Sequence, residues 1–279
     1  MSRLNWRRRV DRLFSALVAG SVILAATPVL ALLVFVVIRG LPGLLDPAFF
    51  TDLPHPAGVP GGGVVNAIIG TVIIVGIASL VAIPFGVLIG IFLSEFGQNR
   101  LGDSVRFVSD VLTGMPSIAF GLFGYTILVA TLGHFSALSA AAALALLMLP
   151  VILRATESAL LLVPQALREA GLALGAPRWR VTLEIIVPAA LGAIATGALL
   201  AMARATGETA PLLFTALGNN YLELNPGHPM AALSLIVFHN ALSPYEHLQN
   251  QAWAAALLLV ILVSLANLLA RLLVRRVQR

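Results

Sequence analysis

The sequence contains neither cysteine nor lysine, and each absence excludes a class of protein. Without cysteine, the chain has no disulfide framework and no thiolate metal site. Without lysine, it has no standard P-loop, because that motif grips phosphate with a lysine ammonium group. All 17 basic residues are arginine. The chain is therefore not itself a P-loop ATPase.

Charged residues of either sign are also scarce. They make up 10% of the 279 residues, whereas 59% are hydrophobic, and the mean hydropathy is +0.98. Soluble domains contain about 25% charged and about 45–50% apolar residues. The composition therefore predicts an integral membrane protein with several spans. Because the arginines cluster beside hydrophobic segments, they explain the basic balance, and we expect no nucleic-acid partner.

Six apolar runs are candidates for membrane spans, each of which needs about 20 residues. We expect an all-α integral membrane fold with helices near 13–38, 64–93, 106–131, 137–153, 183–217 and 253–270. Residues 1–63 would form an N-terminal tail, the first helix and an external loop. Residues 64–279 would form the transmembrane domain.

Shorter features interrupt this pattern. A polar loop is expected at 95–106, and proline or glycine is expected to break two helices, at Pro116 and near Gly207 and Pro211. The apolar run 230–242 is too short to cross a bilayer. We expect it at the outer interface or partway into the membrane.

The arginines predict the orientation of the spans. Fifteen of the 17 flank the spans on one face, whereas the opposite face has only Arg39. Loops rich in arginine lie on the cytoplasmic side of a membrane. The six-span arrangement therefore predicts that both termini and residues 154–180 are cytoplasmic.

A short amphipathic helix is predicted at 164–174, between two of the spans. Pro164 suits a first helical turn, and Gly175, Ala176 and Pro177 stop the helix. Leu167, Ala170, Gly171 and Leu174 are spaced as one apolar face, with Gln165, Arg168 and Glu169 opposite. Such a helix either docks on a partner or lies on the membrane surface.

The residues of this stretch resemble a known motif. Glu169-Ala170-Gly171, Gly175, Ile185 and Val187-Pro188 keep the spacing of the EAA loop of ABC importer membrane subunits, with Gly171 and Val187 as mild departures. The resemblance implies a type I ABC importer permease fold with a coupling loop at about 154–188, whose cytoplasmic coupling helix docks on a dimer of ATPase subunits. The coupling residues would be Arg168, Glu169, Ala170, Gly171, Gly175 and Ala176.

One arginine falls within a span. Arg204 and Glu208 are four residues apart, which places both side chains on one helix face. An arginine at mid-membrane costs about 2.5–3.5 kcal/mol on insertion scales, so it normally faces a bundle interior or an aqueous path. Its guanidinium fork suits phosphate oxygens. The alternative is a structural ion pair without a ligand.

Three segments resemble permease subunits of phosphate ABC importers: Arg204 with the following GETAP, Leu112–Phe123 and Leu149–Ala176. The resemblance implies a substrate path with Arg204, Glu208, Thr209 and Arg154. The alternative for Arg154 is a side chain that only snorkels to the membrane interface. It also implies a bacterial plasma membrane location and no cofactor. The implied partners are a homologous second permease, an external phosphate-binding protein, lipid and inorganic phosphate.

Other functions remain open on the sequence alone. The same machine could carry another oxyanion, such as phosphonate or molybdate. A membrane-embedded enzyme would need acid/base or metal groups at membrane depth, where the sequence offers only Arg204 and Glu208. A non-transporting anchor for the ATPase is a third possibility. We expect a transporter subunit that performs no covalent chemistry.

Overall fold

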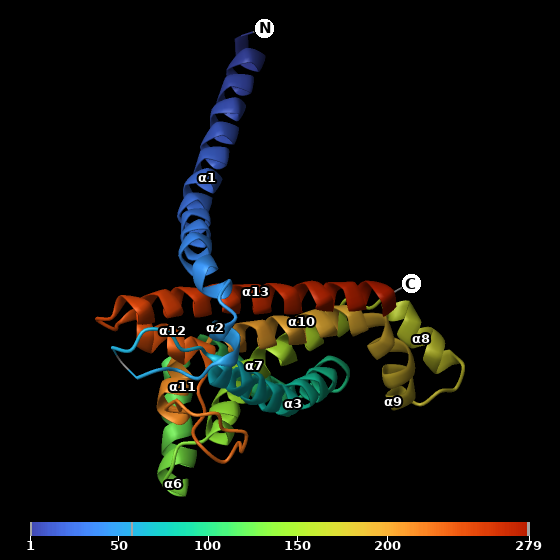
Figure 1. Ribbon diagram of the computed structural model, residues 1–279. Helices are drawn as coiled ribbons and strands as arrows, with labels where there is room; N and C mark the ends of the chain where they lie inside the picture. Colours follow the sequence, from blue (N-terminus) through green and yellow to red (C-terminus); the bar gives the residue numbers. More distant parts are fainter. Residues whose placement is uncertain (1, 57, 278–279) are drawn as a thin grey trace.

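The computed structural model describes residues 2–56 and 58–277, and every regular element within them is a helix (Figure 1). Five of the described helices are long and apolar enough to cross a membrane, and a bent pair adds a sixth if it counts as one span. The predicted all-α membrane fold is confirmed. The elements are α1 (Ser2–Leu44), α2 (Ala48–Thr51), α3 (Val65–Glu95), α4 (Arg100–Gly114), α5 (Ser117–Gly124), η1 (Tyr125–Val129), α6 (Ala130–Leu132), α7 (Ala137–Leu161), α8 (Gln165–Ala173), α9 (Arg178–Val181), η2 (Thr182–Ile186), α10 (Val187–Gly207), α11 (Ala210–Thr215), α12 (Leu233–Ala241) and α13 (Glu246–Val277).

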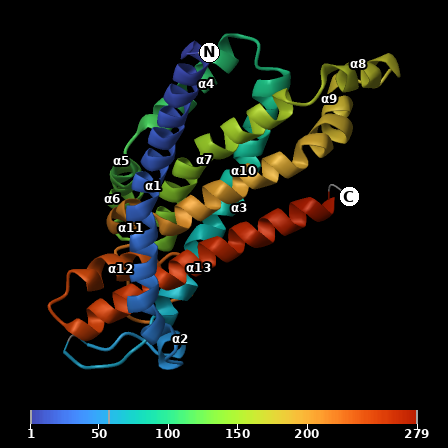
Figure 2. The ribbon, with the colours of Figure 1, turned by 90° about the horizontal axis from the view of Figure 1, so that it is seen from above.

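The long helices α3, α7, α10 and α13 form a bundle (Figure 2). Helices α8 and α9 lie at one end of it, and α2 and α12 lie at the other. Helix α1 packs on α13 near its own C-terminal end and projects away from the bundle (Figure 1). Glycine permits this contact, because a Cβ on Gly40 would lie 2.6 Å from the Trp253 carbonyl oxygen.

Small residues bring α7 close to both of its neighbours in the bundle. On α3, a Cβ on Gly86 would lie 2.8 Å from Cβ of Ile152, and one on Gly90 would lie 2.5 Å from Cβ of Thr156. On the other side, Gly197 of α10 faces Ala155. Helix association in lipid depends on such close packing, because lipid tails leave little hydrophobic driving force between helices.

We expect Gly90→Val to destabilise the α3–α7 contact. The added side chain has no room beside Thr156 and the Leu153 carbonyl, and overpacking of this kind costs about 1–3 kcal/mol. The matched control is Gly76→Val in the same helix, where an added Cβ meets nothing within 4 Å. Thermal unfolding of the two purified variants checks this, and equal midpoints would contradict it.

The predicted break of the third span at Pro116 is confirmed, whereas the sharp angle of the bend was not predicted. The predicted polar loop 95–106 is wrong in its second half, because α4 begins at Arg100, where the Asn99 side chain accepts a hydrogen bond from the Gly102 N–H. Helices 100–114 and 117–132 meet at an angle of 104°. Pro116 causes the break, because it disfavours a helical residue before it and Met115 is extended.

The fifth span also departs from a single helix. It begins at Arg178, passes through the π-helical turn η2 and ends at Gly207, after which α11 starts at Ala210. The predicted interruption near Gly207 and Pro211 is confirmed. Helix α11 then packs against α5, where a Cβ on Gly121 would lie 2.7 Å from Cα of Pro211. The two breaks therefore lie at the ends of a pair of helices that touch.

Candidate functional site

The predicted amphipathic helix exists and is α8. It begins at Gln165 after Pro164 and ends at Ala173, within one residue of the expected bounds. Gly175 follows with φ +81°, a left-handed conformation that L side chains rarely adopt. A Cβ on Gly175 would meet nothing within 4 Å, so this turn faces open space.

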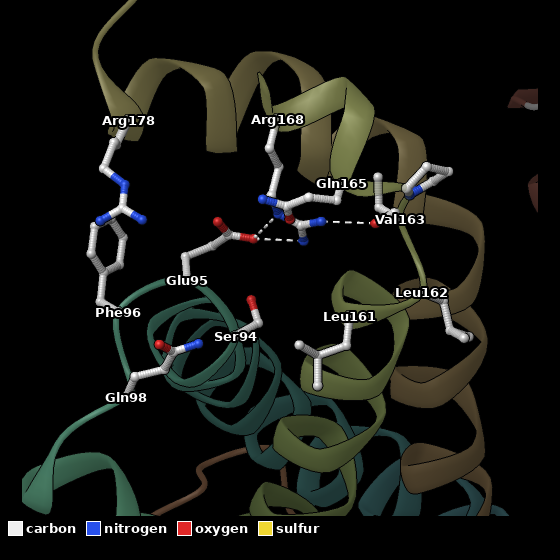
Figure 3. A pocket seen from close by; sticks show the side chains of 11 residues that line it. Ser94, Glu95, Phe96, Gln98, Leu161, Leu162, Val163, Gln165, Arg168 and Arg178 are labelled. Carbon is white, nitrogen blue, oxygen red and sulfur yellow. Dashed lines mark hydrogen bonds and ion pairs between the residues drawn. The ribbon is translucent and has the colours of Figure 1, made fainter. Parts of the chain in front are cut away.

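The predicted apolar face of α8 is mostly not packed against the rest of the chain. Of its four residues only Gly171 is buried, and Leu174 is 88% exposed. Arg168, expected on the outer face, points inward instead (Figure 3). Glu169 and Ala170 are exposed and Ala176 is half-buried. The exposed surface of α8 is therefore largely uncharged, with Glu169 as its acidic group.

Arg168 is held by partners from two other helices. Its Nε and Nη2 donate to Oε1 of Glu95 at 3.1 and 2.9 Å. Its Nη1 donates to the Val163 carbonyl at 2.8 Å and its Nη2 to the Leu160 carbonyl at 2.7 Å. The Arg168 and Glu95 side chains are only 15% and 12% exposed.

A hollow of about 640 Å³ opens beside this ion pair (Figure 3). We call it the α8 hollow. The end of α3, the end of α7 and α8 line it, and so does Arg178 at the start of α9. Leu162, on its rim, is 83% exposed. Exposed apolar side chains at a polar hollow are typical of a surface that another protein covers.

The predicted Arg204–Glu208 pair is present at the end of α10. Nε of Arg204 donates to Oε1 of Glu208 at 3.2 Å. The Arg204 side chain is 50% exposed, whereas that of Glu208 is 16% exposed. The Glu208 carbonyl accepts a hydrogen bond from the Ser234 hydroxyl, and half-buried Thr209 precedes α11. The pair thus sits at the break between α10 and α11.

Arg154 lies in a different environment, a network between α7 and α4. Its Nη1 donates to Glu157 at 3.0 Å, and its Nη2 donates to the Arg106 carbonyl and to the Asp110 carboxylate. The Glu157 side chain is 6% exposed and also accepts from Nε of Arg106 at 2.7 Å. The structure does not bring Arg154 to Arg204, and a role for Arg154 in the substrate path stays a prediction.

Several of these partners were missed in the sequence. Glu157 follows Arg154 by three residues, a spacing that signals contact on a helix. Glu95 and Asp110 carry no such signal, because they lie 73 and 44 residues from their arginines. Only the packing of α3 and α4 against the later helices brings these charges together.

Comparison with known proteins connects these features to a family. Residues 82–279 match the family described as "Binding-protein-dependent transport system inner membrane component". The chain is 42% identical to the phosphate transport system permease protein PstA of Yersinia pestis, over 95% of this chain and 90% of that protein. It is 38% identical to PstA 1 of Mycobacterium tuberculosis, over 96% of this chain and 90% of that protein.

The chain belongs to the family of PstA permeases.

The fold agrees with this PstA assignment. An inward-facing structure of the MetNI methionine ABC transporter superposes with a TM-score of 0.66 at 22% identity, covering 77% of this chain and 96% of that one. The chain therefore has a type I ABC importer permease fold. PstA permeases are multi-pass membrane components of ABC transporters, which work with ATPase subunits. Helix α8 carries the EAA spacing and stays the predicted coupling helix of this fold.

Proposed function

We propose that this chain is the membrane permease subunit of an ATP-driven importer of inorganic phosphate in the bacterial plasma membrane. The observation that carries the proposal is its similarity, over almost the whole chain, to phosphate transport permeases. The chain contributes a path and a coupling surface. ATP hydrolysis belongs to its partners.

The mechanism is alternating access. An external phosphate-binding protein delivers the anion to the end of the bundle near α12, and a homologous second permease completes the path. Two ATPase subunits move α8 at the opposite, cytoplasmic end, where both termini of the chain also lie. The fold and the exposed surface of α8 support this arrangement.

Arg204 is the phosphate-binding arginine of the path in this proposal. Its Nη1 and Nη2 have no hydrogen-bond partner in the described part of the chain, so both can donate to phosphate oxygens. Arg154, by contrast, already uses both of these nitrogens. Glu208 offsets the charge of Arg204 while the path is empty, and Thr209 lies beside it at the helix break.

Uptake by the complete complex tests the proposal. Vesicles containing the permeases and ATPases, with binding protein outside, are expected to accumulate labelled phosphate only when ATP is inside. A tenfold excess of phosphonate or molybdate is expected to leave this uptake unchanged, because their binding protein and path are different. Preferential uptake of either competitor would refute the assignment to phosphate, and ATP hydrolysis without any uptake would favour a mere anchor.

A further inference from the structure

Arg168 connects α8 to the ends of two long helices, α7 and α3. It donates to the Leu160 carbonyl in the last turn of α7 and to the Val163 carbonyl two residues beyond that helix, and it pairs with Glu95, the last residue of α3. Helix α8 is covalently linked to α7 on one side and α9 on the other. Its hydrogen-bonded link to α3 within the described residues is the Arg168–Glu95 pair.

The hydrogen bonds and charges around Arg168 favour a single, fixed arrangement of α8 on the ends of α3 and α7. The last carbonyls of a helix have no partner within that helix, and its C-terminal end carries a partial negative charge. Arg168 donates to one carbonyl in the last turn of α7 and to one just beyond that helix, and it neutralises a carboxylate at the end of α3. A guanidinium fork can do this in one geometry, because its donors are fixed in a plane.

The exposed charge of α8, Glu169, and its inward-pointing charge, Arg168, have separate roles. Glu169 is exposed and available to a partner protein. The half-buried Arg168 donates its hydrogen bonds to partners from its own chain, so its guanidinium is not available to the ATPase in this arrangement. If displacement of α8 is to move the long helices, a residue must hold α8 against them.

We propose that Arg168 is a positioning residue: with Glu95 it fixes α8 to the ends of α3 and α7, so that displacement of α8 is passed to both spans. This proposal rests on the proposed function for its source of displacement. It assigns Arg168 to the transmission of movement inside the chain and not to contact with the ATPase.

A distance measurement tests the joint without measuring transport. Because this chain has no native cysteine, Gln98→Cys, beyond α3, and Leu174→Cys, just beyond α8, can carry two spin labels, in a complete complex whose other subunits have their cysteines replaced. With Arg168 present, we expect the same narrow distance distribution without nucleotide and with ATP. With Arg168→Ala, we expect a broader distribution whose mean differs between these two states.

The matched control is Arg178→Ala, which removes an arginine from the same α8 hollow that makes no ion pair within the described residues. It is expected to keep the narrow distribution. A distance that changes with ATP although Arg168 is present would overturn the proposal, and so would an Arg168→Ala distribution like that of the control.

A second readout covers the possibility that Arg168→Ala fails to fold. Glu95→Gln keeps an oxygen acceptor but removes the charge, and it is expected to lower anion transported per ATP hydrolysed by about tenfold. The ATPase is expected to remain bound in this variant. Loss of ATPase binding, or an unchanged ratio, would overturn the proposal. If the complex carried an anion other than phosphate, the proposed substrate would be wrong, whereas the distances would still decide the role of Arg168.

Discussion

Replacing Arg204 by glutamine is expected to abolish phosphate uptake while the complex still assembles. Glutamine keeps much of the side-chain length but loses the charge and the fork of two free donors that would face the anion. A hydrogen bond to a charged group contributes about 1.5–3 kcal/mol, so losing two predicts a fall in uptake of at least about a hundredfold. The initial rate of labelled phosphate uptake measures the loss of transport, and co-purification of the subunits measures assembly of the complex.

Arg180→Gln is the matched control for this variant. Arg180 also pairs with a glutamate four residues on, Glu184, and both side chains are more than half exposed at the α8 end of the bundle. Exposed pairs of this kind contribute little to stability. Arg180→Gln is therefore expected to transport normally. Wild-type uptake by Arg204→Gln would remove Arg204 from the path.

Replacing Gly175 by arginine is expected to uncouple ATP hydrolysis from uptake. The left-handed backbone at this position costs an L residue about 1–2 kcal/mol. The added side chain does not clash with this chain, because nothing lies within 4 Å of a Cβ there, so it projects where the ATPase would dock. We expect uptake to fall at least about tenfold while ATP is still hydrolysed, as measured in the same vesicles.

Two further variants separate docking from backbone strain. Gly133→Arg places the same side chain on a similar backbone, φ +78° with nothing within 4 Å, in the loop between α6 and α7. Gly175→Asn keeps the tolerated left-handed conformation with a short side chain. Both are expected to retain most of the uptake. Equal uncoupling by Gly133→Arg would mean that strain, and not the docking surface, explains the defect.

Local signals predicted the elements of the coupling site but not their orientation. Pro164 and Gly175 set the bounds of α8 because their backbone preferences act on neighbouring residues. The apolar spacing did not indicate which face packs on the bundle: Arg168 points inward to Glu95, whereas Leu167 and Leu174 are exposed. The Glu95 carboxylate lies 73 residues before Arg168, so the spacing of residues within α8 could not predict this ion pair.

The residues predicted for the substrate path show the same difference between local and distant contacts. The Arg204–Glu208 contact was predicted because a helix brings residues four apart together. The partners of Arg154 on α4 were not predicted, since the 104° bend at Met115 and Pro116 decides where α4 lies. Pro116 predicted a break in the helix but not its angle, and the contact of α5 with α11, about 90 residues later in the chain, was not predicted.

The intimate contact of α3 with α7 has a mechanical consequence. Thirty-one residues at 1.5 Å rise make α3 a rod about 46 Å long, and Gly86 and Gly90 leave no slack between it and its neighbour. Two rods fused in this way resist sliding and bending far better than either alone. We therefore expect the two helices to move together, so that a tilt applied at one end of the pair also displaces its opposite end.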